Sequence, residues 1–237
     1  MSAKIMNLLP VTADVMTPEI FKYMCKYLEA DTEVGTSQIT AGPPTIECEY
    51  DEALAGPYVL ELCKKAEEDG YQAIFINCFG DPAVKAAREY VNIPVFGGFE
   101  PATHIALGLA DKLSIVTVMP HVVSLMRGNV AKAHLNERIV SIRNINIPVE
   151  ELQDHEKVCK ALVEQAVAAI EKDGAEGIVL GCTGFVDVAE RIKTDLLAFG
   201  YDVPVLEAAQ CALKLCEVYA KMGLRQSRLT YMTPPEH

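Results

Sequence analysis

Short apolar runs alternate with longer amphipathic stretches from one end of the chain to the other. Residues 73–77 and 177–181 are nearly continuous apolar runs, as strands of a parallel sheet are when helices cover both faces. We predict strands at residues 5–9, 33–39, 73–77, 95–97, 113–118, 139–145, 177–181 and 203–206, and helices at 17–28, 58–69, 83–90, 102–110, 122–133, 156–172, 186–198 and 208–222. This alternation predicts an α/β protein with mainly parallel sheets flanked by helices.

The sequence also repeats itself. Both long apolar runs follow an Asp-Gly pair, lead directly into a cysteine, and are followed by a helix and a Pro-Val strand. The two cysteines are Cys78 and Cys182. The start of the chain resembles its middle as well, because Asn7 and Thr117 take corresponding places ahead of a proline. The repeat predicts two similar α/β halves, each of which presents one cysteine.

The position of the two cysteines suggests chemistry. Ligands of open α/β sheets bind beyond the carboxyl ends of the strands, and both cysteines lie there, ahead of a predicted helix start that favours a thiolate. Two thiols on opposite faces of one carbon would remove its proton on one side and return it on the other. Backbone amides around Gly80 and Thr183-Gly184 would stabilise the enolate oxygen.

The alternative interpretation is that Cys78 and Cys182 are small buried residues at the ends of two strands. The glycines in Cys-Phe-Gly-Asp-Pro and Gly-Cys-Thr-Gly favour tight loops instead. For the other six cysteines the buried interpretation prevails, and Asp81 with Pro82 is expected to cap the helix after Cys78. Asn7 and Thr117 either orient the substrate or cap local backbone.

Composition excludes several classes of function. The formal net charge of −12 and the lack of a basic patch argue against a nucleic-acid partner. We expect no membrane helix and no signal peptide, and therefore a cytoplasmic protein with free thiols. The cysteines and histidines show no zinc-site spacing, so neither a metal nor another cofactor is expected.

Several motifs together resemble those of the hydantoin racemase family, which belongs to the aspartate/glutamate racemase superfamily. The resemblance covers nearly the whole chain, and Cys-Phe-Gly-Asp-Pro is its most specific part. It rests on the runs Gly42-Pro43-Pro44-Thr45-Ile46-Glu47, Asp51-Glu52-Ala53, Asn77-Cys78-Phe79-Gly80-Asp81-Pro82, Pro94-Val95-Phe96-Gly97 and Leu180-Gly181-Cys182-Thr183-Gly184.

The resemblance implies a cofactor-independent racemase of 5-substituted hydantoins or the related ureide allantoin, with Cys78 and Cys182 as the two bases. We expect the substrate to be a small molecule that is bound by Asn7, Phe79, Gly80, Thr117, Thr183 and Gly184. The fold implied is a pair of pseudo-twofold-related, flavodoxin-like subdomains, residues 1–98 with 208–237 and residues 99–207. Members of the superfamily are commonly oligomeric, so a homo-oligomer is expected.

The chain departs from the family pattern at two places, and alternatives stay open. Leu8-Leu9 stands where the family usually has the rest of Asn-Pro-Asn, and Gly-Cys-Thr-Gly-Phe replaces the more frequent Gly-Cys-Ala-Gly-Met. One alternative is another carbon-acid enzyme of the superfamily: an amino-acid racemase, an arylmalonate-type decarboxylase or a maleate isomerase. A second is a non-catalytic small-molecule binding protein, for which a thiol from each half has no evident use.

Overall fold

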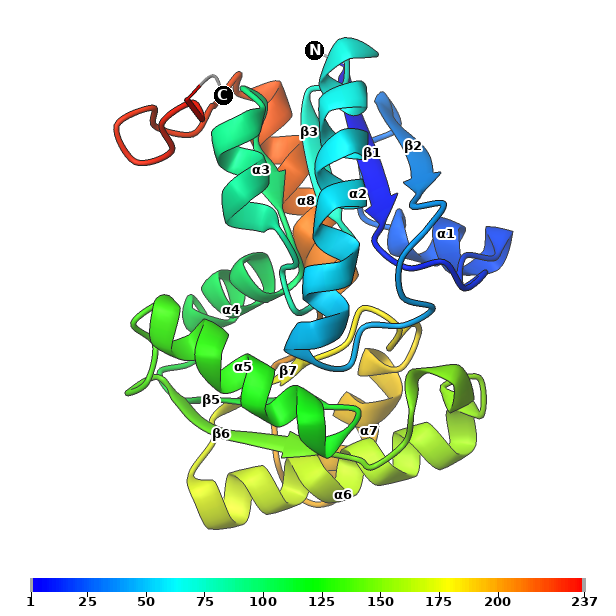
Figure 1. The fold of residues 1–237 in the computed structure, drawn as a ribbon. Helices are drawn as coiled ribbons and strands as arrows, with labels where there is room; N and C mark the ends of the chain where they lie inside the picture. The colour runs from blue at the N-terminus through cyan, green and yellow to red at the C-terminus, as the bar shows by residue number, and fades with distance from the viewer. Residues whose placement is uncertain (1, 236–237) are drawn as a thin grey trace. The chain divides into compact units, whose positions relative to one another are not determined.

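A computed structural model describes residues 2–235, and the chain forms two compact units. Unit 1 contains the chain up to Gly98 together with the part from Ala209 onward, and unit 2 is Phe99–Ala208. Each unit has one four-stranded parallel sheet flanked by helices (Figure 1). The predicted α/β class with two parallel sheets is therefore confirmed.

The sheet of unit 1 is covered by helices on both faces. Met6, Leu8 and Ile74 point into one apolar core, and Ile5 and Phe75 point into the other, because successive strand residues face opposite sides. In pairing order the strands are β2 (Thr32–Gln38), β1 (Ala3–Leu9), β3 (Ala73–Ile76) and β4 (Val95–Phe96). The first core is covered by α2 (Glu49–Glu68) and α3 (Val84–Tyr90), and the second by α1 (Pro18–Met24) and α8 (Ala208–Lys221) (Figure 1).

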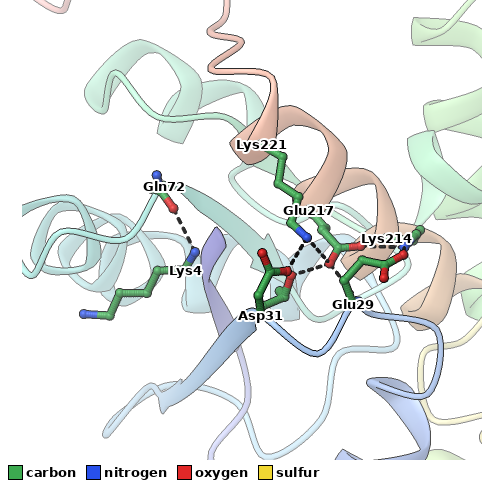
Figure 2. A network of polar contacts seen from close by, with 8 residues as sticks. Lys4, Glu29, Asp31, Gln72, Lys214, Glu217 and Lys221 are labelled. Atoms are coloured by element: carbon green, nitrogen blue, oxygen red, sulfur yellow. Dashed lines mark hydrogen bonds and ion pairs between the residues drawn. The ribbon is translucent and has the colours of Figure 1, made fainter. Parts of the chain in front are cut away.

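A buried carboxylate on α8 forms hydrogen bonds with the segment that leads into β2 of unit 1 (Figure 2). Glu217 on α8 is only 2 % exposed, and its carboxylate accepts hydrogen bonds from the N–H of Glu29 (2.9 Å) and the hydroxyl of Thr32. Lys214 lies 2.6 Å and Lys221 3.4 Å from its oxygens. Burial alone would raise the pKa of Glu217, but the hydrogen bonds from Lys214, Thr32 and Glu29 outweigh it and hold the pKa at about 2.

Unit 2 repeats the strand order of unit 1. In pairing order its strands are β6 (Ile139–Asn144), β5 (Leu113–Thr117), β7 (Gly177–Leu180) and β8 (Val205–Glu207). Its helices are α4 (Phe99–Leu107), α5 (Pro120–Lys132), α6 (His155–Asp173) and α7 (Ala189–Ala198), with a short 3-10 turn at Val149–Glu151. Figure 1 shows α5 and α6 on opposite sides of β6. The sequence repeat thus corresponds to a repeated topology.

Local sequence signals define α6 clearly. The Asp154 carboxylate accepts a hydrogen bond from the Lys157 N–H (3.1 Å) at its start, and Gly174 ends it in the left-handed conformation (φ 72°). These are the expected residue types at the two ends of a helix. Within residues 2–235, none of the helices has the length and apolar character needed to span a membrane.

Helices α4 and α8 lie at the two points where the chain passes from one unit to the other. Helix α4 follows β4 of unit 1 but packs against β5, β7 and β8 of unit 2. Helix α8 follows β8 of unit 2 but packs on the sheet of unit 1. Unit 1 is therefore built from two separate stretches of chain.

One predicted helix boundary was wrong. Helix α2 begins at Glu49, well before the predicted start at residue 58, and Pro57 lies inside it. The Asp51 carboxylate accepts hydrogen bonds from the N–H of Glu47 (3.0 Å) and the thiol of Cys48 (3.2 Å), which stabilises the first turn. This contact supports a helix start at Glu49, nine residues before the predicted one.

Candidate active site

Cys78 lies in a tight turn two residues after the end of β3. Its N–H donates to the carbonyl of Ile76 (2.8 Å), and its carbonyl accepts from the N–H of Gly98 (2.9 Å), so the backbone is held on both sides. The Sγ atom accepts the N–H of Gly80 at 3.4 Å. The side chain is half-buried.

Cys182 has the same local geometry two residues after the end of β7. Its Sγ atom accepts the N–H of Gly184 at 3.3 Å, and its carbonyl accepts the N–H of Phe185 at 3.1 Å. This side chain is also half-buried. Each sulfur therefore receives a backbone N–H from the glycine two residues further on, a bond that strengthens when the acceptor carries charge.

The two helices that we expected directly after the cysteines begin several residues later. Helix α3 begins only at Val84 and α7 only at Ala189. Asp81 (φ 59°) and Ala83 (φ 56°) adopt the left-handed conformation and delay α3, while Asp187 (φ 59°) does so before α7. Each sulfur accepts the N–H of a glycine within its own turn.

The prediction that Asp81 caps α3 with Pro82 as first helical residue was wrong. Ala83 occupies the N-cap position, without a side-chain hydrogen bond to the helix. Asp81 instead packs against Gly97, where an added Cβ atom would come 2.1 Å from its Oδ1. Asp81 and Ala83 both have a left-handed backbone, so the helix begins after them, at Val84.

The predicted substrate-binding residues fall into two groups by burial. Asn7 and Thr117 are completely buried in β1 and β5, and Phe79 is 3 % exposed. Thr183 is half-buried and Gly184 exposed. The remaining predicted contact, Gly80, is a buried glycine whose N–H points to Cys78.

Asn7 and Thr117 do not occupy equivalent places, contrary to the sequence comparison. Leu8 pairs with Ile76 in unit 1, and Val116 pairs with Leu180 in unit 2. Asn7 precedes Leu8 whereas Thr117 follows Val116, so Thr117 lies two positions closer to the cysteine end of its sheet. The two prolines had suggested an alignment that the strand register does not support.

Burial raises the pKa of four other thiols. Burial raises the pKa of Cys25 to about 11 and that of Cys63 to about 12, and it raises the pKa of Cys159 and Cys216 as well. Such thiols remain protonated at neutral pH and are poor proton acceptors. The interpretation of these four cysteines as structural residues agrees with this.

Glu207, which the sequence did not single out, supports the Cys182 loop. It ends β8, is 4 % exposed, and its Oε1 accepts the N–H groups of Val188 and Ala189 at 2.9 Å each. It therefore satisfies the first backbone donors of α7. Val188 and Ala189 lie far from Glu207 in the sequence, so no local sequence motif predicts this contact.

An open pocket of about 550 Å³ lies within unit 1 at the carboxyl ends of β1 and β2. Leu9, Phe21 and Val34 supply apolar walls, and Thr36 and Gln38 are among its polar residues. The strand at 33–39 was predicted, but none of its residues carried a motif that pointed to a site. Within the described part of the chain, no group of three or more His, Cys, Asp or Glu residues is arranged to hold a metal ion.

Comparisons with known sequences point to one protein family. The sequence model of the Asp/Glu/Hydantoin racemase family matches residues 5–216. A hydantoin racemase of Pseudomonas sp. (strain NS671) is 34% identical over 236 residues, which are 99% of this chain and 92% of that protein. A hydantoin racemase of Paenarthrobacter aurescens is 30% identical over 98% of both chains.

A solved structure shows the same likeness in three dimensions. The allantoin racemase from Klebsiella pneumoniae superimposes with a TM-score of 0.90 at 31% identity, covering 100% of this chain and 95% of that one. The match of the family model to most of the chain, the full-length relatives and the repeated Cys-x-Gly turns lead to one conclusion. The chain belongs to the Asp/Glu/hydantoin racemase family and is a racemase.

Proposed function

We propose that this racemase inverts C5 of a 5-substituted hydantoin, or the corresponding carbon of the ureide allantoin, with Cys78 and Cys182 as its two acid–base groups. The proposal is supported by the relatives, which are named hydantoin and allantoin racemases. The observation that carries it is the repeated turn, in which each sulfur accepts the N–H of the glycine two residues on. It requires that the two sulfurs reach opposite faces of one carbon.

The reaction needs only proton transfer. One thiolate removes the C5 proton, and the C–H electron pair delocalises onto the adjacent carbonyl as an enolate. The opposite thiol then gives its proton to the other face of C5, and the enolate electrons form the new C–H bond. The first cysteine ends as a thiol and the second as a thiolate, so the roles are exchanged for the reverse direction.

The glycine N–H groups suit these roles. A positioned N–H stabilises charge without reorganising when the sulfur ionises. A hydantoin C5–H is adjacent to a carbonyl, so the carbanion formed there is delocalised as an enolate. Burial instead keeps thiols such as Cys63 and Cys216 protonated.

The substrate class is tested with single enantiomers of 5-benzylhydantoin, allantoin, aspartate and glutamate, whose optical rotation is followed with purified enzyme. We expect the rotation of 5-benzylhydantoin or allantoin to decay to zero, while that of the two amino acids persists. Decay for aspartate or glutamate with no change for either ring compound would overturn the substrate assignment. Gas-evolving loss of a carboxylate from an arylmalonate would point to a decarboxylase instead.

The two cysteines are tested separately in deuterated water. Cys78→Ser and Cys182→Ser should each abolish racemisation yet still exchange the C5 proton of one enantiomer, and the two variants should prefer opposite enantiomers. Cys211→Ser, also a half-buried thiol, is the matched control and should retain wild-type racemisation. A Cys182→Ser enzyme that racemises at the wild-type rate would refute the two-thiol mechanism.

Two further parts of the proposal concern cofactors and assembly. We expect full activity after exhaustive dialysis against EDTA, and loss of activity that added metal restores would contradict the mechanism. The homo-oligomer expected from the family resemblance stays a prediction, which light scattering of the purified protein tests directly.

A further inference from the structure

In each unit, a fully buried polar side chain on the first strand is bonded to the residue that precedes the cysteine. In unit 1, the side-chain amide of Asn77 donates to Oδ1 of Asn7 at 3.0 Å. In unit 2, the hydroxyl of Thr117 donates to the carbonyl of Gly181 at 2.8 Å. Asn7 and Thr117 are each 0 % exposed.

The two junctions use different residues at equivalent positions. Asn7 pairs in register with Phe75, and Ile115 pairs with Val179, so Asn7 corresponds to Ile115 and Asn77 to Gly181. In unit 2, Ile115 fills the space of the missing side chain, since a Cβ at residue 181 would lie 2.6 Å from its Cγ2. Thr117 then supplies the hydrogen bond that the amide pair supplies in unit 1.

Both the oxygen and the nitrogen of the Asn7 side-chain amide form hydrogen bonds. Its Oδ1 accepts from Asn77, and its Nδ2 donates to the hydroxyl of Thr36 at 3.4 Å. An unpaired buried amide or hydroxyl costs free energy, so these bonds fix where the strand end and the following cysteine lie. The N–H···S bond of each turn depends on that placement.

We propose that Asn7 and Thr117 are positioning residues, Asn7 for the thiol of Cys78 and Thr117 for the thiol of Cys182. The inference rests on the proposed two-thiol reaction but goes beyond it, because it assigns each residue to one proton transfer only. Removing one bond should therefore slow the transfer at one cysteine and leave the other intact.

Overall rates cannot reveal this asymmetry. Two enantiomers have equal free energies, so kcat/KM must remain the same in both directions in any variant. In deuterated water, however, one enantiomer loses its proton to the intact thiol. Because protonation by the impaired thiol is slow, the intact thiol, which exchanges its proton with solvent, returns deuterium to the same face of the carbon. Deuterium in unreacted substrate, measured for each enantiomer by mass spectrometry, therefore identifies the impaired cysteine.

Thr117→Val and Asn7→Leu remove the two bonds with little change of shape. For 5-benzylhydantoin or allantoin, whichever the wild type racemises, we expect kcat to fall on the order of tenfold and KM to change less than about threefold. Thr117→Val should incorporate deuterium into the same enantiomer as Cys182→Ser. Asn7→Leu should incorporate deuterium into the same enantiomer as Cys78→Ser. Thr117→Ser, which keeps the hydroxyl, should restore the wild-type pattern.

Ser114→Ala is the matched control on the same strand as Thr117. Its hydroxyl is buried and bonded to Ser141 (2.8 Å), so its loss should lower stability without favouring either enantiomer. Equal deuteration of both enantiomers in Thr117→Val and Asn7→Leu, or the same enantiomer in both, would overturn the inference. If Asn7→Leu does not fold, Asn77→Ala removes the same bond from a half-buried position.

A second readout is independent of substrate. The iodoacetamide alkylation rate of each thiol, followed by peptide mass spectrometry, should change at least about threefold for Cys182 in Thr117→Val and not for Cys78. Asn7→Leu should do the reverse. Parallel changes at both thiols, or none, would refute positioning. If the wild type racemises no probe, the proposed function fails, and this measurement still decides the positioning roles.

Discussion

Replacing Glu217 by Gln tests how strongly the buried carboxylate holds α8 on unit 1. Its pKa of about 2, against an ordinary value of 4.5, corresponds to about 3 kcal/mol of folding free energy at neutral pH, since each pKa unit is worth about 1.4 kcal/mol. A lowered pKa stabilises the fold above the unfolded value, and this contribution is lost as pH falls from about 4.5 towards 2. At pH 3 roughly 1 kcal/mol of it should remain.

The assay is urea unfolding of wild type and Glu217→Gln, followed by far-UV circular dichroism at pH 7 and pH 3. We expect the variant to be less stable by about 3 kcal/mol at pH 7 and by about 1 kcal/mol at pH 3. Glu151→Gln is the control, because its ion pair with Lys157 (2.8 Å) is exposed and should contribute less than about 1 kcal/mol. A difference in unfolding free energy between wild type and Glu217→Gln that is small at pH 7, or equally large at both pH values, would refute the reasoning.

Two substitutions and one labelling experiment test the loops and the buried thiols. Ala83→Gly should stabilise unit 1 by about 0.5–1 kcal/mol. Ala83 has a φ of 56°, which costs a non-glycine residue about 1–2 kcal/mol, and the greater conformational entropy of glycine in the unfolded chain offsets part of the gain. A lower urea midpoint for the variant would contradict this. Gly181→Ala should cost about 1–3 kcal/mol and reduce racemisation, because the new Cβ meets Ile115 at 2.6 Å; an unchanged melting temperature would count against it. Cys63 and Cys216, both fully buried, should stay unmodified by iodoacetamide at pH 7.5 until urea is added, and peptide mass spectrometry would expose early labelling.

The strands were predictable because a strand that is buried on both faces of its sheet is apolar at nearly every position. The runs at 73–77 and 177–181 are apolar at nearly every position, and the cysteines after them repeat with the same neighbours. The two turns were therefore recognised as candidate sites. The predicted helix began only at residue 58, whereas α2 begins at Glu49, where the Asp51 carboxylate accepts the N–H of Glu47 and stabilises the first turn.

The details of the site depend on features without a local sequence signal. Asp81, Ala83 and Asp187 adopt left-handed conformations that non-glycine residues seldom take, so the delayed helix starts after the cysteines were not foreseeable. Glu207 caps residues distant in sequence, and only the fold brings them together. The strand register, which separates Asn7 from Thr117 by two positions, likewise follows from pairing rather than from local pattern.

The return of α8 to the sheet of unit 1 affects how the chain folds during synthesis. Unit 2 is one continuous stretch, Phe99–Ala208, and all its strands and helices are available once that stretch has left the ribosome. Unit 1 must wait for α8, because Ala212, Leu213 and Cys216 complete the core that covers Ile5 and Phe75. Although most of unit 1 is made first, it is finished last, because the helix that covers one face of its sheet is translated after residues 99–208.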